Sequence, residues 1–172
     1  RLDTSFGEGE VQQYYEENLE NFKLSEDLVK LRYINLLKKN NNIDEIKRKL
    51  SRFNAEDRNE LEKISFQFVN YSFNDSVWVK TKTVYDKVGP LSVDDRQKLM
   101  NKNSFFQLED SLAVYLVYVK DALKRSEQAP LEYARPAIRQ ILLNKRKQNL
   151  IKELEKDITK DAIKNKQFEI NN

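Results

Sequence analysis

A long helical stretch at the C-terminal end of the sequence most constrains what this chain can fold into. Apolar residues recur at helical spacing over 131–166, which predicts one long amphipathic helix. Its apolar stripe consists of Leu131, Ala134, Ile138, Ile141, Leu142, Leu150, Leu154, Ile158 and Ala162. Pro136 is expected to kink this helix or to reset its start, because proline lacks a backbone N–H. The wholly polar run 144–149 predicts a part of the helix that bridges two contacts across open solvent.

Shorter helices are indicated by capping residues that precede apolar residues at helical spacing. Asn54 with Asp57, and Ser92 with Asp95, have the three-residue separation of a helix-start capping pair. Gly7 can open a first helix in the same way. Helices are therefore expected at 7–22, 43–53, 54–71 and 92–100.

Strands are indicated by runs of β-branched and aromatic residues. In the run 28–37, Val29, Leu31 and Tyr33 alternate with basic residues, as in a half-buried strand. A short strand is expected at 77–79. The strongest β signal is a hairpin in which strands at 105–108 and 112–120 flank a polar turn.

The order of these elements predicts an α+β fold. Helix, strand, two helices, short strand, helix, hairpin and long helix do not alternate as a parallel sheet requires. We expect a small antiparallel sheet with surrounding helices, plus a short N-terminal helix and a long C-terminal one. The predicted divisions are an N-terminal helix at 1–27 that packs with the C-terminal arm, a central domain at 28–122 and a helical arm at 123–172.

The sequence contains neither histidine nor cysteine. This absence excludes Ser-His-Asp and Cys-His catalysis, structural zinc sites of the usual ligands and disulfide bonds. Carboxylates, Lys, Tyr and Ser are the groups left for any chemistry. We expect no catalytic residues, no metal ligands and no cofactor.

The charged residues nearly balance. The 31 basic and 28 acidic residues give a net charge of +3, so a nucleic-acid partner is not expected. The mean hydropathy of −0.80 is typical of a protein with much exposed helix. No apolar run approaches the roughly 18 residues of a membrane-spanning helix, and the start at Arg1 indicates a mature or trimmed product.

Two end segments and the order of elements carry a resemblance to a known family. Tyr14, Tyr15 and Phe22 precede the first predicted strand, and the segment 129–158 (APLEYARPAIRQILLNKRKQNLIKELEKDI) follows the last one. Both segments resemble those that flank the parvulin prolyl isomerase domain in SurA-type and PpiD-type periplasmic folding factors. The resemblance covers roughly 7–170 and implies a parvulin-like central domain.

The chain departs from that family at the positions that carry its catalysis. Active parvulins have a histidine in the first strand and another in the last, and this sequence has Tyr33 and Tyr115 at the matching places. Asn74 stands where the family has cysteine or aspartate, and the family's glycine-rich loop has no counterpart in 75–83. Tyrosine titrates near ~10, so it cannot replace a group poised near neutrality. We expect prolyl isomerase activity to be absent or very weak.

The resemblance implies a bacterial, periplasmic chaperone or holdase that binds extended or unfolded client polypeptides without catalysis. A lipid anchor upstream of Arg1 is left open. Two alternatives remain: an accessory scaffold subunit of an outer-membrane assembly or secretion machine, and a weakly active prolyl isomerase that uses its tyrosines.

Seven residues are candidates for client binding: Tyr14, Tyr15, Tyr33, Asn74, Trp78, Met100 and Tyr115. A leftover substrate groove would use Tyr33, Asn74 and Tyr115, with Trp78 and Met100 lining the same hollow. The alternative for each is ordinary packing in the core or on a face of the sheet. The basic run 145–147 is either a solvated helix face or a footprint for anionic lipid or nucleic acid.

Overall fold

The structure is a computed structural model that describes residues 5–171, with side chains described as far as Lys166. By its internal contacts the chain divides into two units. We call the continuous unit Lys23–Glu127 the sheet domain, and the unit formed by the segments before and after it the helical unit. The three-part division expected from the sequence stays a prediction.

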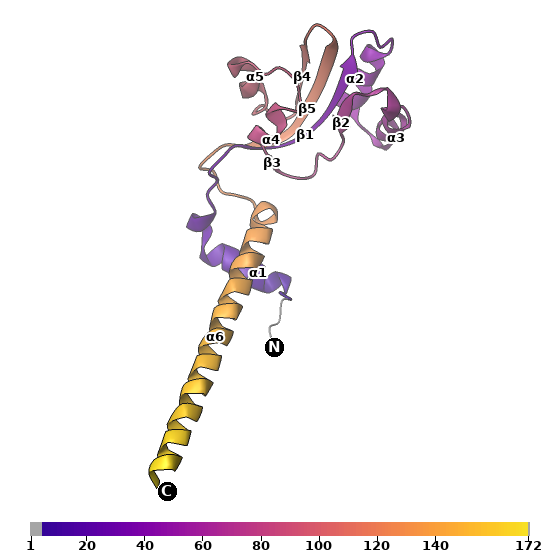
Figure 1. Ribbon diagram of the computed structural model, residues 1–172. Helices are drawn as coiled ribbons and strands as arrows, with labels where there is room; N and C mark the ends of the chain where they lie inside the picture. The colour runs from indigo at the N-terminus through magenta and orange to yellow at the C-terminus, as the bar shows by residue number, and fades with distance from the viewer. Residues whose placement is uncertain (1–4, 172) are drawn as a thin grey trace. The chain divides into compact units, whose positions relative to one another are not determined.

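The sheet domain contains five antiparallel strands in one sheet, which confirms the predicted α+β class (Figure 1). The strands are β1 (Leu28–Leu37), β2 (Asn70–Ser72), β3 (Val79–Lys80), β4 (Ser104–Glu109) and β5 (Ala113–Leu123). Their order is β2-β1-β5-β4, and β3 pairs with the start of β1. The hairpin of β4 and β5 forms as predicted, with a turn at 110–112.

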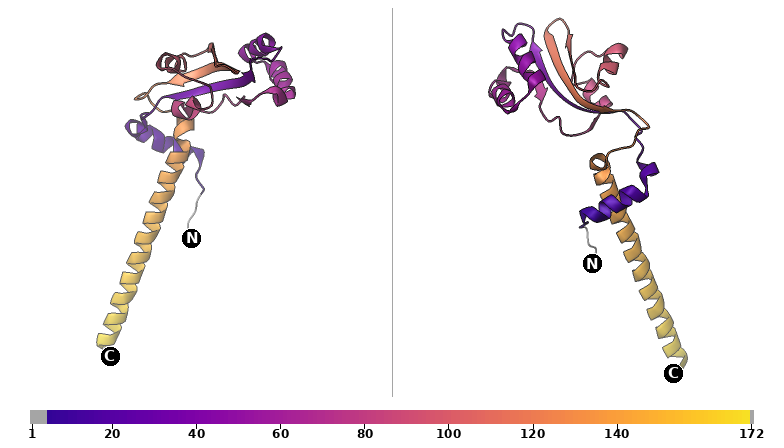
Figure 2. Two further views of the ribbon diagram at one scale, coloured as in Figure 1. Left: turned by 45° about the horizontal axis from the view of Figure 1, so that its top comes forward. Right: turned by 180° about the vertical axis from the view of Figure 1, so that it is seen from behind.

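Helices cover both faces of this sheet (Figure 2). On one face α2 (Ile43–Arg52) and α3 (Ala55–Lys63) pack over Ile34, Leu36 and Leu116. On the other, α4 (Thr81–Tyr85) and Leu99, the C-cap residue of α5 (Val93–Lys98), pack over Tyr33 and its neighbours. For this reason nearly every residue of β1 is buried. The strand is therefore covered on both faces and is not the half-buried strand that its sequence predicted.

Local signals explain where most helices begin. At the start of α3, the side chain of Asn54 accepts a hydrogen bond from the backbone N–H of Asp57, and the carboxylate of Asp57 accepts one from the backbone N–H of Asn54. Ser92 and Asp95 form the same capping box at the start of α5. The prediction of a helix over 54–71 is wrong for the second half of that range. The observed helix α3 ends at Lys63, and a 3₁₀ turn, η2 (Ser65–Gln67), leads into β2.

The helical unit consists of α1 (Glu8–Glu17), the 3₁₀ turn η1 (Leu19–Phe22) and α6 (Leu131–Asn171). Val11 of α1 is fully buried against Ala134 and Ile138 of α6. Pro136 lies inside α6 without resetting its start, because the helix begins at Leu131 and continues through it. Beyond the crossing with α1, α6 continues as a single helix (Figure 1). No helix among residues 5–171 is long and apolar enough to cross a membrane.

Candidate functional site

Tyr33 and Tyr115 lie on neighbouring strands and share one face of the sheet. In the β1–β5 pairing Tyr33 is opposite Val117, and Asn35 is opposite Tyr115. Alternate residues of a strand point to the same face, so the two tyrosines lie together on the face that α4 and Leu99 cover. Met100 packs against the same core. This face therefore brings together three of the seven candidates.

The Tyr115 side chain is held in place at both ends. Its hydroxyl donates a 2.5 Å hydrogen bond to Oδ2 of Asp110. Gly89 packs against its ring in the left-handed conformation (φ 108°), and an added Cβ there would lie 2.6 Å from the ring carbon Cγ. Only glycine fits this approach. The hydrogen bond from Tyr115 and the amides of Leu112 and Ala113 lower the pKa of Asp110.

Neither tyrosine hydroxyl is prepared for acid–base chemistry near neutral pH. Burial raises the pKa of Tyr33, against a smaller opposing effect of its hydrogen bond with Asn70. The hydrogen bond to Asp110 raises the pKa of Tyr115. Both shifts move the pKa values of these hydroxyls further above neutral pH, so neither group can act as a base there.

Asn35 is a polar residue of this face that the sequence did not single out. Its side chain is 6% exposed, and Nδ2 donates a 2.7 Å hydrogen bond to the carbonyl oxygen of Lys87. Its Oδ1 is buried and accepts no hydrogen bond within the part of the chain that the structure describes. An amide in a strand gives no sequence signal that distinguishes a buried position from an exposed one.

Two further candidates lie away from the tyrosine pair. Asn74 is exposed in the loop between β2 and β3. Trp78 is buried, with the ammonium of Lys30 4.8 Å from its ring centroid, and does not belong to the core around Tyr33. Asn74 and Trp78 were predicted to line one hollow with Tyr33 and Tyr115, and in the structure they do not lie with that pair.

The opposite face of the sheet contains a buried ion pair that the sequence did not predict. Arg32 is 5% exposed, and its Nη1 lies 2.8 Å from Oδ2 of Asp75. The guanidinium lies over the rings of Tyr118 and Phe53, at 3.9 and 4.4 Å from their centroids. Lys120 approaches the second oxygen of Asp75 at 3.7 Å.

Arg32 also closes the C-terminal end of α2. Its Nε donates to the carbonyl oxygen of Leu50 at 2.8 Å, and Nη2 donates to that of Ser51 at 3.1 Å. The last carbonyls of a helix lack partners within the helix, and a cation there interacts favourably with the helix dipole. Burial lowers the pKa of Arg32, and Asp75 opposes that shift. Three of the five guanidinium N–H groups therefore have partners inside the fold, which ties β1 to the end of α2 and to the loop that carries Asp75.

Tyr14 and Tyr15 belong to α1 of the helical unit and pack in the cluster that α1 forms with α6. The hydroxyl of Tyr15 donates a 2.7 Å hydrogen bond to the carbonyl oxygen of Ala129, and its ring stacks on Phe22. The ammonium of Lys145 lies 4.7 Å from the ring centroid of Tyr14. The two tyrosines are half-buried in contacts within their own unit.

Two members of the basic run 145–147 take part in this packing. Besides the contact of Lys145 with Tyr14, the guanidinium of Arg146 lies 4.0 Å from the ring centroid of Phe6 and 3.1 Å from a carboxylate oxygen of Glu10. Arg146 also donates to the carbonyl oxygen of Ser5 at 2.6 Å. Much of the positive charge of the run is therefore directed at α1.

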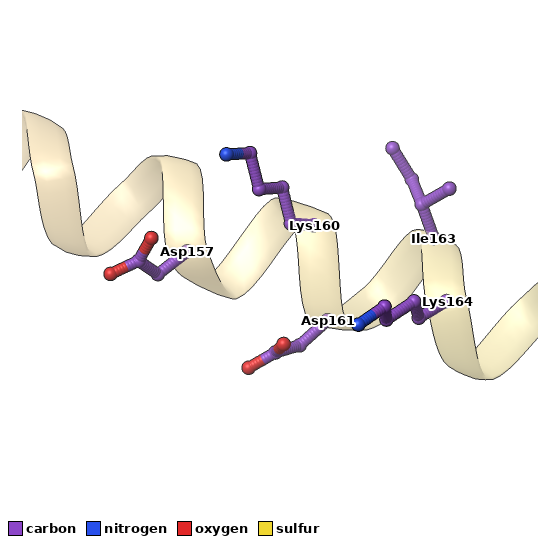
Figure 3. A pocket seen from close by; sticks show the side chains of 5 residues that line it. All are labelled: Asp157, Lys160, Asp161, Ile163 and Lys164. Carbon is purple, nitrogen blue, oxygen red and sulfur yellow. The ribbon is translucent and has the colours of Figure 1, made fainter.

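The rest of α6 exposes apolar side chains. Every side chain from Ile151 to Lys166 is exposed. Among them are the large apolar residues Ile151 (54% exposed), Leu154 (52%), Ile158 (68%) and Ile163 (53%). Figure 3 shows one part of this surface, where Asp157, Lys160, Asp161, Ile163 and Lys164 project from successive turns of a single helix. Charged groups thus interleave with the apolar ones. We call residues 151–166 the exposed arm.

No group of three or more carboxylates that could hold a metal ion occurs in the described part of the chain. Comparisons with known proteins give little further guidance. No family model matches the chain, and no curated protein matches it. Among solved structures, it is similar to one from work on PEB4 and the periplasmic protein Cj1289, two SurA-like chaperones of Campylobacter jejuni. The identity is 10% and the TM-score 0.33, over 91% of this chain and 62% of the other. This likeness does not establish a family for the chain.

Proposed function

We propose that this protein is a periplasmic holdase, which binds extended or unfolded polypeptides and does no chemistry on them. The observation that carries the proposal is the exposed arm of α6. Four large apolar side chains there are more than half exposed, and no other described segment covers them. A row of exposed apolar side chains is typical of a surface that binds another molecule.

The spacing of these residues suits varied apolar partners. Ile151, Leu154 and Ile158 follow one another at intervals of three and four residues, so they share one side of the helix. Lysines and carboxylates occupy most of the remaining positions and keep the arm hydrated when no client is bound. Burying one such side chain contributes about 1.5–3 kcal/mol, so a client that covers several of them can be held reversibly.

The sheet domain supports the same proposal by what its tyrosines do. Tyr33 and Tyr115 keep the positions at which the resemblance places catalytic groups, but both hydroxyls have internal partners and raised pKa values. A holdase requires no group poised near neutrality. The arm, and not this pair, is therefore the surface on which we base the test.

The test compares two triple variants of the exposed arm. Ile151→Gln with Leu154→Gln and Ile158→Gln removes the apolar side while keeping good helix formers. Lys152→Gln with Glu155→Gln and Lys156→Gln is the matched control, because it alters three exposed residues on other sides of the same turns. The measurement is light scattering by a chemically denatured model protein diluted into buffer with each chain.

We expect the wild type and the control to suppress aggregation equally and the apolar variant to lose most of the effect. Circular dichroism has to show the same helix content for all three chains. Equal suppression by the apolar variant would refute the proposal. Co-purification with one partner at fixed stoichiometry, without suppression of aggregation, would favour the scaffold alternative instead.

A further inference from the structure

The two edges of the sheet differ in length and regularity. One edge is formed by β2 and β3, which have three and two residues and pair with separate parts of β1. The other edge is β4, which pairs with β5 over all six of its residues without a shift in register. Within residues 5–171, no backbone hydrogen bond joins the outer side of β4 to another segment.

Natural sheets usually protect such an edge. Very short strands, proline, lysine and β-bulges are the common means, because an open strand offers unpaired N–H and C=O groups to any extended chain. The edge at β2 and β3 is protected by its short strands. The sequence of β4, SFFQLE, contains neither lysine nor proline, and its pairing with β5 has no bulge. The β4 edge therefore lacks these protections.

The side chains of β4 give this edge an apolar border on both faces. Phe105 and Gln107 are half-buried on the α2 face, where the ammonium of Lys47 lies 5.2 Å from the Phe105 ring centroid. Phe106 and Leu108 belong to the core of the opposite face. A strand placed beside β4 would find apolar neighbours on both faces, with the charged Glu109 only at the end of β4.

We propose that the outer edge of β4 binds an extended segment of client polypeptide, which adds to the sheet as a further strand. This inference rests on the proposed holdase function and names how such a chain would bind in the sheet domain. Unpaired main-chain donors and acceptors at strand spacing are satisfied by an extended chain and not by a helix. Because the main chain supplies the hydrogen bonds, clients of differing sequence are accepted, with a preference for alternating apolar residues.

Cross-linking tests the location, and the absence of native cysteine keeps the background clean. Gln107→Cys places one thiol on β4, and Asn59→Cys places one on the exposed surface of α3 as a matched neutral control. The probe is an eight-residue peptide of alternating threonine and valine with one central cysteine. Under mild oxidation we expect the β4 thiol to form the mixed disulfide about tenfold more than the control, since a bound strand raises the local peptide concentration.

Hydrogen exchange tests the mode of binding. With saturating cysteine-free peptide, alternate amides of β4 should exchange at least about tenfold more slowly, while those of the exposed arm stay unchanged. Peptides N-methylated at alternate residues should bind in one register of methylation and fail in the other. Equal labelling of both thiols, unchanged exchange along β4, or dimers of the free chain joined at β4 would each overturn the proposal. These measurements do not use aggregation, so they can fail while the arm test succeeds, and the reverse.

Discussion

At Arg32 one side chain joins β1, the end of α2 and the loop that carries Asp75. Arg32→Met is expected to lower the free energy of unfolding of the sheet domain by about 3 kcal/mol, because the buried Asp75 then keeps only the more distant Lys120 ammonium as a cation, and two helix carbonyls lose their donors. The measurement is urea unfolding followed by the fluorescence of Trp78, the single tryptophan, which is buried in the same domain.

Arg58→Met is the matched control for this prediction. Arg58 pairs with Glu62 on the exposed surface of α3, with about half of each side chain exposed, so its loss should cost no more than about 1 kcal/mol. The double variant Arg32→Met with Asp75→Leu should recover part of the lost stability, since the buried carboxylate that had lost its closest cation is then removed. Equal unfolding midpoints for Arg32→Met and Arg58→Met would show that the buried pair does not stabilise the domain.

Arg32 and the tyrosine pair differ in how far their positions could be predicted from the sequence. The sequence placed Tyr33 and Tyr115 on two strands, and the register puts both on one face. It gave no sign that Arg32 is buried, because a basic residue in an alternating strand is usually solvated. Its burial depends on Asp75 and on the end of α2, which lie 43 and 18 residues away in sequence. Such partners are known only once the chain has folded.

At the level of elements, α6 contains both a packed part and an exposed part, which one pair of substitutions can separate. Ile138 is fully buried against α1, whereas Ile151 is 54% exposed. Ile138→Ala should weaken the packing of α1 by about 2–5 kcal/mol, and Ile151→Ala should change it by less than about 0.5 kcal/mol. The measurement is amide exchange of α1. Similar exchange rates in both variants would mean that α1 does not depend on this contact.

The elements predicted correctly are those whose signals are local. The bounds of β1 match the predicted run 28–37, and the capping pairs locate the starts of α3 and α5. The strand β2 was missed because Ile64 and Phe68 have the spacing of a helix. There, pairing with β1 outweighs the helical pattern, as Tyr71 lies opposite Ile34. Pairing between distant segments is the information that local patterns lack.

For the whole molecule, the sheet domain is an insertion between the two parts of the helical unit. One unit is the continuous segment 23–127, while the other takes residues from both ends of the chain. Within the helical unit the two parts meet directly, since the amide of Ala129 donates a 2.7 Å hydrogen bond to the carbonyl oxygen of Phe22. Within the sheet domain, Leu24 exchanges two 2.8 Å backbone hydrogen bonds with Ser126 and Glu127. In each unit, backbone hydrogen bonds therefore join the two chain segments that lead to the other unit.

This arrangement predicts that the two units fold independently. The segment 23–127, produced alone, should unfold at nearly the same urea concentration as the whole chain when Trp78 fluorescence is followed, because both of its cores lie within it. The helical unit should form from a chain in which a short glycine-rich linker joins Phe22 to Gln128, since those ends already lie beside each other. Its check is the exchange protection of α1. If the isolated sheet domain instead unfolded at a much lower urea concentration, contacts between the units would have to contribute to its stability.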